Sequence, residues 1–197
     1  MSRHVSSPVS IQATRRELNQ RQAGTVARLS VAAGEELRSV GFDAMTIRGV
    51  ASRASVAPAT AYTYFSSKNH LVAEIFWRRL NERPGIEITR DSALDRVIAV
   101  FEDLAAFLAA EPELAAATTS ALLGTDPDVR QLRVMVGVEI NTRLADALGD
   151  EAGPGVLDAL TLGWSGAMLQ AGMGHARYEQ MGARLASLSR LVMGGVR

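Results

Sequence analysis

The sequence predicts an all-α protein of about nine helices. Apolar residues recur at spacings of three and four along most of the 197 residues, which is the period of an amphipathic helix. Glycine, proline and capping residues interrupt these stripes, and no alternating β-type pattern of useful length occurs between them. With 47% hydrophobic and 21% charged residues, the chain has the composition of a globular protein.

The amino-terminal third predicts three helices behind a polar arm. Residues 1–18 show no periodicity, so we expect a flexible basic arm. A stripe from Val26 to Val40 predicts the first helix, and Gly41 is typical of its carboxy-terminal cap. Thr46 is a good N-cap for the second helix, and Pro58 suits the first turn of a short third helix.

The rest of the chain is also predicted to be helical. Ser66 and Ser67 begin a fourth helix over about 68–82, and Arg83–Pro84–Gly85 ends it. We take that break as a boundary between one domain over 19–83 and another over 84–197. The later helices are expected near 91–110, 112–123, 128–148, 156–176 and 178–194.

Composition excludes several classes of site. The chain has no cysteine, which excludes disulfides, a thiol nucleophile and cysteine-ligated metals, and its three histidines are too scattered for a metal cage. We find no P-loop, nucleophile elbow or dinucleotide-binding glycine pattern, so we expect no catalytic residues and no cofactor. No signal peptide or membrane span is predicted, and a cytoplasmic protein is expected.

Charge is distributed unevenly. Residues 1–83 contain twelve basic and six acidic residues, whereas residues 84–197 contain nine basic and fifteen acidic ones. A basic amino-terminal part on an acidic remainder indicates a polyanionic partner for the first part, although a chance surface imbalance is the alternative.

Residues 46–65 have the pattern of a helix-turn-helix. Two short helices joined by a tight turn need small residues where they cross, and Ala51, Ala54 and Ala61 supply them. Val56 is placed to fill the turn. In such a unit the second helix enters the major groove of DNA and the first lies across the backbone.

The wider segment from Val26 to Leu80 resembles the amino-terminal domain of the TetR family of bacterial transcriptional regulators. The family pattern combines a glycine-aromatic helix end, a helix-turn-helix and an aromatic-Ser-Lys tail. The residues that match it are Gly41, Phe42, Ala44, Thr46, Arg48, Val50, Ala51, Ala54, Val56, Thr60, Tyr62, Tyr64, Phe65, Ser67 and Lys68. Ser55 stands where the family commonly has glycine, so we expect it to adopt a left-handed conformation at some cost.

The resemblance implies a DNA-binding surface on the helix-turn-helix. Thr46 is either an N-cap alone or also a DNA contact, Arg48 is either a solvated residue or a contact, and Tyr62 is expected to be partly buried. Arg15, Arg16 and Arg21 belong either to a minor-groove arm or to a plain tail. The predicted DNA-binding residues are Thr46, Arg48, Ala57, Pro58, Ala59, Thr60, Tyr62, Tyr64 and Lys68.

The resemblance also implies that residues 84–197 bind a ligand and dimerise. Glycines such as Gly163 and Gly172 favour a close helix approach across a two-fold interface, with packing inside one subunit as the alternative. The predicted interface residues are Val156, Leu160, Met181, Leu185, Leu188 and Val192. The predicted lining of a pocket for a small apolar effector, which is otherwise ordinary core, is Phe101, Leu104, Phe107, Leu108, Met135, Trp164 and Met168.

Together these features predict a DNA-binding transcriptional regulator. We expect a homodimeric repressor that binds a pseudo-palindromic operator in double-stranded DNA and is released by a small apolar effector. The alternatives are a helical protein-interaction module without DNA binding and an all-α enzyme.

Overall fold

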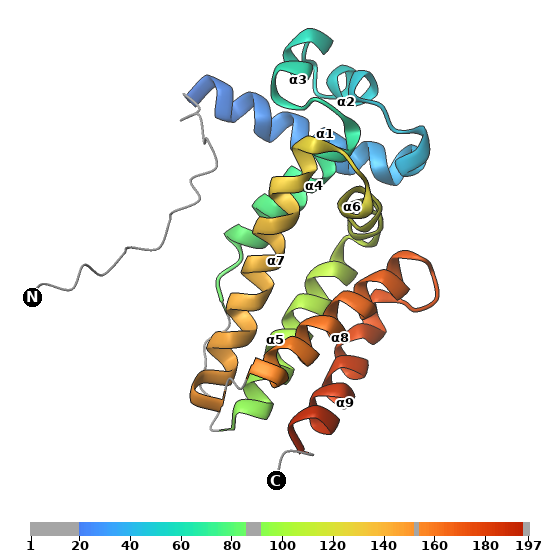
Figure 1. Ribbon diagram of the computed structural model, residues 1–197. Helices are drawn as coiled ribbons and strands as arrows, with labels where there is room; N and C mark the ends of the chain where they lie inside the picture. Colours follow the sequence, from blue (N-terminus) through green and yellow to red (C-terminus); the bar gives the residue numbers. More distant parts are fainter. Residues whose placement is uncertain (1–19, 86–91, 152–153, 195–197) are drawn as a thin grey trace, which may run out of the picture.

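A computed structural model describes residues 20–85, 92–151 and 154–194. This part of the chain folds into nine α-helices and two short 3₁₀ helices, without strands (Figure 1). The elements are α1 (Gln20–Ala44), α2 (Ile47–Arg53), α3 (Pro58–Tyr64), α4 (Lys68–Glu82), α5 (Ala93–Ala110), α6 (Pro112–Leu123), α7 (Pro127–Leu148), η1 (Gly149–Glu151), α8 (Pro154–Gly172), η2 (Tyr178–Gln180) and α9 (Met181–Gly194). The all-α prediction is therefore confirmed, while the predicted arm lies outside the described residues.

Helices α1 to α3 form one end of the molecule, at the top of Figure 1. Their buried apolar residues, including Leu29, Leu37, Val50 and Phe65, make one cluster with the first half of α4. The first helix was predicted to end at Gly41, but α1 is kinked there and continues to Ala44; Gly41 has a positive φ of 74° at the kink. Glycine adopts this conformation without the steric cost that a Cβ atom would bring.

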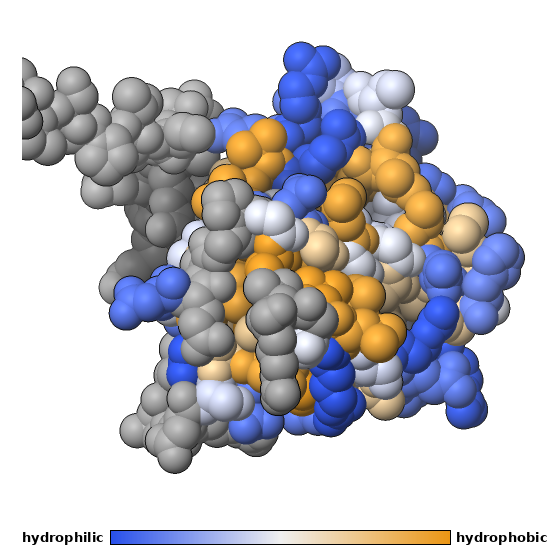
Figure 2. Space-filling view, turned by 60° about the horizontal axis from the view of Figure 1, so that its bottom comes forward, coloured by the Kyte–Doolittle hydropathy of each residue, from blue (hydrophilic) through white to orange (hydrophobic). Residues whose placement is uncertain are grey.

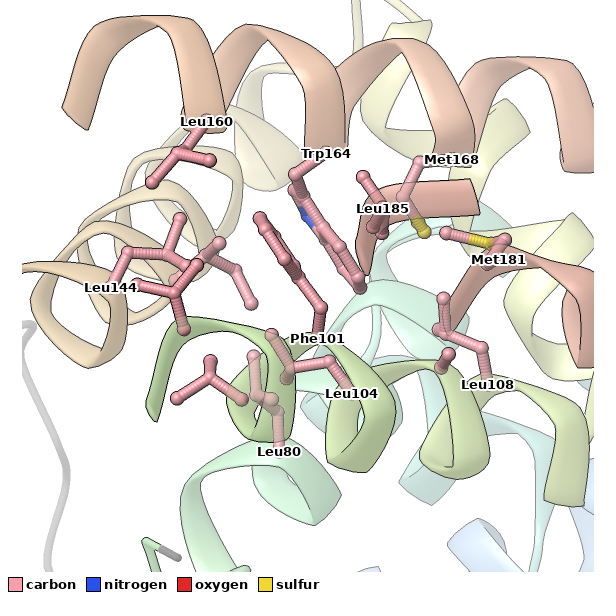
Figure 3. Close-up of a cluster of buried hydrophobic side chains, with 14 of the residues drawn as sticks. Leu80, Phe101, Leu104, Leu108, Leu144, Leu160, Trp164, Met168, Met181 and Leu185 are labelled. Carbon is pink, nitrogen blue, oxygen red and sulfur yellow. The ribbon is translucent and has the colours of Figure 1, made fainter. Parts of the chain in front are cut away.

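A second apolar cluster fills the bundle of α5, α7, α8 and α9. Helix α5 contacts α7 and α9, and α8 packs against α7 and α9. Phe101 on α5 lies parallel to Trp164 on α8, with ring centroids 6.3 Å apart, and Leu104 and Leu185 lie beside them (Figure 3). The apolar stripes predicted for these helices thus face one common interior.

Helices α4 and α6 contribute to both clusters. On α4, Leu71 belongs to the cluster of α1 to α3, whereas Leu80 belongs to the bundle. On α6, Leu114 belongs to the first cluster and Ala115 to the second. A shift of either helix therefore displaces side chains in both clusters, since packed interiors transmit displacement.

The apolar run in α8 is part of this bundle. Within residues 20–85, 92–151 and 154–194, no helix is both long enough and apolar enough to cross a membrane.

Truncating a buried side chain of α5 should destabilise the fold far more than truncating an exposed one. Leu104 is 1% exposed and Leu123 is 67% exposed. Leu104→Ala should lower the free energy of unfolding by about 2–5 kcal/mol, and Leu123→Ala should change it by less than about 0.5 kcal/mol. Denaturant unfolding of both variants measures this difference, and equal losses would contradict the packing described for α5.

Candidate nucleic-acid interface

Helices α2 and α3 cross at small residues, as predicted. Ala51 and Ala61 are fully buried, and Ala54 is nearly so. The backbone N–H groups of Ala54 and Val56 donate to carbonyls of α2 at 2.9 Å, which closes the turn between the helices. Ser55 has a φ of 53°, so the predicted left-handed conformation is confirmed.

The predicted DNA-contacting residues lie on one end of the molecule. Seven of them are exposed on α2, α3 or the segments that precede these helices, and Tyr64 and Lys68 are half-buried. Tyr62 was expected to be partly buried, but it is 47% exposed and is not part of the apolar cluster that contains Ala61. The exposed set is Thr46, Arg48, Ala57, Pro58, Ala59, Thr60 and Tyr62.

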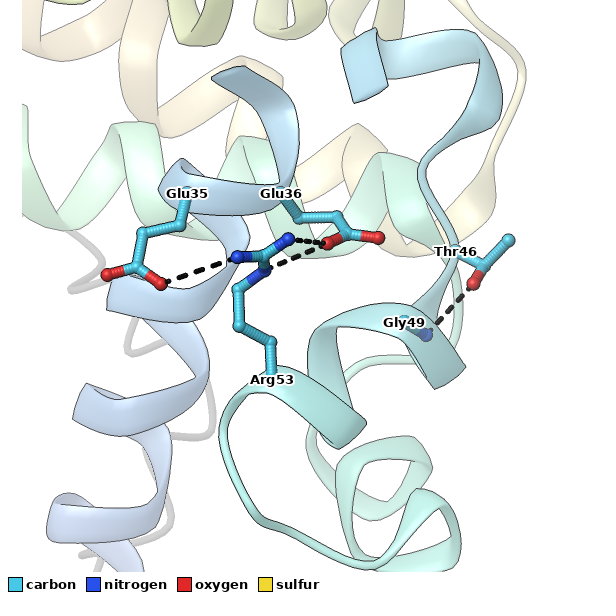
Figure 4. A network of polar contacts seen from close by, with 5 residues as sticks. All are labelled: Glu35, Glu36, Thr46, Gly49 and Arg53. Carbon is cyan, nitrogen blue, oxygen red and sulfur yellow. Dashed lines mark hydrogen bonds and ion pairs between the residues drawn. The ribbon is translucent and has the colours of Figure 1, made fainter. Parts of the chain in front are cut away.

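Thr46 caps α2. Its hydroxyl oxygen accepts a hydrogen bond of 2.9 Å from the backbone N–H of Gly49 (Figure 4). The N-cap role predicted for Thr46 is therefore confirmed, and its contact with DNA stays a prediction.

An ion pair that the sequence analysis missed holds α2 against α1. The Arg53 guanidinium donates to one carboxylate oxygen of Glu36 at 2.8 and 2.9 Å, and it lies 3.9 Å from Glu35 (Figure 4). The Glu36 carboxylate passes so close to Gly49 that a Cβ atom there would lie 2.5 Å from its oxygen. Helical spacing cannot reveal this contact, because the partners come from different helices.

Lys68 contacts the end of α1. Its ammonium group donates to the carbonyls of Phe42 and Asp43, each at 2.9 Å, and it lies 4.7 Å from the centroid of the Phe42 ring. The positive charge is unfavourable at the start of α4 but favourable at the carbonyl end of α1. An ammonium group has three N–H donors, so one is left for the predicted contact with DNA.

The turn between α3 and α4 also contacts the start of α7. Ser67 caps α4 by accepting from the backbone N–H of His70, and its hydroxyl donates to Asp126, the N-cap of α7. Ser66 donates to Asp128. The hydrogen bond from Ser67 lowers the pKa of the Asp126 carboxyl below its ordinary value. These polar contacts join two helix starts about sixty residues apart in the sequence.

The predicted effector pocket is filled by its own side chains. Phe107 packs against Phe76 with ring centroids 5.3 Å apart. Met135 is half-buried and belongs to none of the apolar clusters of the described residues, so it does not line the predicted interior. A pocket between α4, α5 and α6 encloses about 10 Å³, the room of one water molecule. The other predicted lining residues lie inside the bundle cluster: Phe101, Leu104, Leu108, Trp164 and Met168.

The predicted dimer interface needs correction. Leu160, Met181 and Leu185 are at most 2% exposed and pack inside their own chain, so they cannot contact a second copy. A Cβ atom on Gly163 would lie 2.1 Å from the Leu188 side chain, and one on Gly172 would lie 2.7 Å from Thr119, so contacts within the chain explain both glycines. The half-buried residues of the prediction are Val156, Leu188 and Val192.

Other predicted features lie partly beyond the described residues. Arg15 and Arg16 lie outside the described residues, and Arg21 belongs to the first turn of α1; the contact of all three with DNA stays a prediction. The described residues bring together no group of three or more His, Asp or Glu side chains that could hold a metal ion.

Residues 29–75 match the family model of bacterial regulatory proteins of the tetR family. An uncharacterized HTH-type transcriptional regulator of Mycobacterium tuberculosis H37Rv is 42% identical over 179 residues, which cover 90% of this chain and 84% of that protein. A counterpart in Mycobacterium bovis shows the same identity and coverage.

Solved structures share the fold at lower identity. A TetR transcriptional regulator from Rhodococcus sp. RHA1 matches with a TM-score of 0.70 and 21% identity, covering 91% of this chain and 100% of that one. The transcriptional regulator FadR from Bacillus subtilis, solved in complex with stearoyl-CoA, matches with a TM-score of 0.61 and 18% identity, covering 87% and 99%.

The left-handed serine in the turn should be replaceable by glycine with a gain in stability. Ser55→Gly removes a Cβ atom from a residue with φ of 53° and should raise the free energy of unfolding by about 0.5–1 kcal/mol. The same change within α2, Ser52→Gly, should lower it by about 0.5 kcal/mol, because glycine is a poor helix former. Thermal unfolding of both variants tests whether the two changes in stability have opposite signs. A lower stability of Ser55→Gly would contradict the strained turn.

Proposed function

Because this chain belongs to the TetR family of bacterial transcriptional regulators, we propose that it is a homodimeric repressor released from a pseudo-palindromic operator by a small apolar effector. The family and the relatives are DNA-binding regulators, not enzymes. A cytoplasmic location follows for the proposed repressor, since bacterial DNA lies there.

The observation that carries the DNA-binding proposal is the exposed face of α2 and α3. This face lies at the end of the molecule farthest from the bundle of α5, α8 and α9 (Figure 1). It belongs to the part of the chain with a twofold excess of basic over acidic residues. We assign Thr46, Arg48 and Tyr64 to the phosphates, with one further N–H from Lys68, and the face of α3 to the bases.

We place the dimer contact on the outward faces of α8 and α9. Leu162 and Leu169 on α8 and Leu191 on α9 are exposed, as is Met173 directly after α8. Figure 2 brings forward the lower end of the molecule as drawn in Figure 1, and hydrophobic residues gather in the middle of this end. Gly166 is exposed on α8 with open space where a Cβ atom would lie, which suits the close approach of a partner helix.

We assign an apolar effector to the interior between α5, α7 and α8. The cluster around Phe101 and Trp164 is closed, so an effector must separate these helices to enter. Methionines such as Met168 adapt their shape to a flexible ligand. The stearoyl-CoA bound by FadR gives a chemical precedent in a protein of the same fold. Because α4 and α6 contribute to both clusters, such a separation would shift α3.

Arg48→Ala should weaken DNA binding mainly through the loss of one phosphate contact. We expect lower affinity for all sequences alike and a plot of log affinity against log salt that is shallower by about one unit. Fluorescence anisotropy of a labelled duplex at several salt concentrations measures both. Arg177→Ala, in the connection between α8 and α9, is the matched control and should leave the slope unchanged. An unchanged slope in Arg48→Ala would remove this residue from the DNA contacts, and an absence of salt-dependent DNA binding by the natural chain would overturn the proposal.

Leu162→Arg should dissociate the dimer. It places a positive charge in the proposed dimer contact, where burying a charge without an oppositely charged partner costs several kcal/mol. Leu162 is 64% exposed in one chain, so the variant should still fold. Leu123→Arg changes an equally exposed leucine on α6 and should remain dimeric. Light scattering over a concentration series measures the mass, and a Leu162→Arg dimer as stable as the natural one would place the contact elsewhere.

A further inference from the structure

The exposed face of α3 carries no group able to make a bidentate hydrogen bond with a base. It consists of alanine, proline, threonine and tyrosine side chains, which include no guanidinium, ammonium, amide or carboxylate group. The hydroxyl of Thr63 already donates to the carbonyl of Ala59 at 3.0 Å. Thr60 and Tyr62 are left with one hydroxyl each. The exposed residues of this face are Ala57, Pro58, Ala59, Thr60, Tyr62 and Thr63.

The neighbouring helix does not supply the missing group to the centre of this face. Of the two guanidinium groups on α2, that of Arg53 is held by Glu36 at 2.8 and 2.9 Å, on the side of α1 (Figure 4). Arg48 is exposed in the first turn of α2, the helix that lies across the DNA backbone in this motif. Its charge therefore goes to phosphates rather than to the bases under α3.

The chemistry of the major groove then selects one kind of base. Guanine is read by bidentate arginine or lysine and adenine by bidentate asparagine or glutamine, whereas thymine alone offers a methyl group to apolar side chains. We propose that α3 recognises its operator chiefly by contacts between the small apolar side chains of Ala57 to Thr60 and thymine methyl groups. This inference rests on the proposed DNA-binding function and specifies the DNA sequence class that the site takes.

Thr60 allows the methyl contact to be separated from hydrogen bonding. Thr60→Ser keeps the hydroxyl and removes the methyl group, while Thr60→Val keeps the methyl and removes the hydroxyl. Because Thr60 is exposed on α3, neither change disturbs the buried cluster behind Ala61.

The test uses the full chain and a duplex that it selects from a random DNA pool. Each thymine of one half-site is replaced in turn by deoxyuridine, which lacks only the methyl group, and affinity is measured by competition at fixed salt. We expect the loss of a contacted methyl to weaken binding by about fourfold, the ratio for one buried methyl-sized group. Thr60→Ser should abolish the thymine preference at one position, and Thr60→Val should retain it.

The possible failures are distinguishable. In the first case the chain selects a defined sequence, and replacing every thymine by uracil does not lower the affinity. If 7-deazaguanine, which lacks the N7 acceptor of guanine, does lower the affinity, the bases are read by hydrogen bonds. That result overturns this inference and leaves the proposed function intact. If Thr60→Val loses the thymine preference while Thr60→Ser keeps it, the hydroxyl is the reader and the inference is also wrong. If no sequence is selected, the proposed function fails and the inference fails with it.

Discussion

The placement of the recognition helix depends on the segment Ser66–Ser67–Lys68, which comprises the turn after α3 and the first residue of α4. Helix α3 buries only Ala61 of its own seven residues, so apolar packing alone holds it weakly. This segment donates hydrogen bonds to the end of α1 through Lys68 and to the start of α7 through the two serines. Because charge-assisted hydrogen bonds are among the stronger polar contacts in proteins, these hydrogen bonds fix the position of α3 relative to the rest of the chain.

Similar contacts recur at other helix ends. The last carbonyls of a helix have no partner within the helix, and a cation from another element can satisfy them. Arg96 on α5 donates to the carbonyl of Ala147 at the end of α7, and Arg143 on α7 donates to that of Leu80 at the end of α4. Cations thus join the ends of α1, α4 and α7 to neighbouring helices, which leaves the apolar faces to fill the two clusters.

Much of this architecture was predictable from local signals. The Thr46 cap, the break in α1 at Gly41 and the left-handed Ser55 each depend on neighbours within four residues, and sequence spacing expresses them directly. The dimer prediction failed in part because an apolar stripe identifies the buried face of a helix but not its partner. Leu160 and Leu185 face the interior of their own chain. The apolar residues on the outward faces of α8 and α9 are identified by their exposure and not by their spacing. The pairs Arg53–Glu36 and Ser67–Asp126 join distant elements that no spacing rule connects.

Hydrogen–deuterium exchange of Lys68→Met tests most directly whether the segment Ser66–Ser67–Lys68 holds the DNA-binding helices in place. The substitution removes the two hydrogen bonds to the end of α1 and the charge beside the Phe42 ring, but keeps an unbranched side chain of similar length. Backbone amides of α2 and α3 should exchange at least about tenfold faster, the ratio for about 1.4 kcal/mol, while the exchange rates of those of α5 should be unchanged. Exchange in α2 and α3 as slow as in the natural chain would contradict this role of the segment.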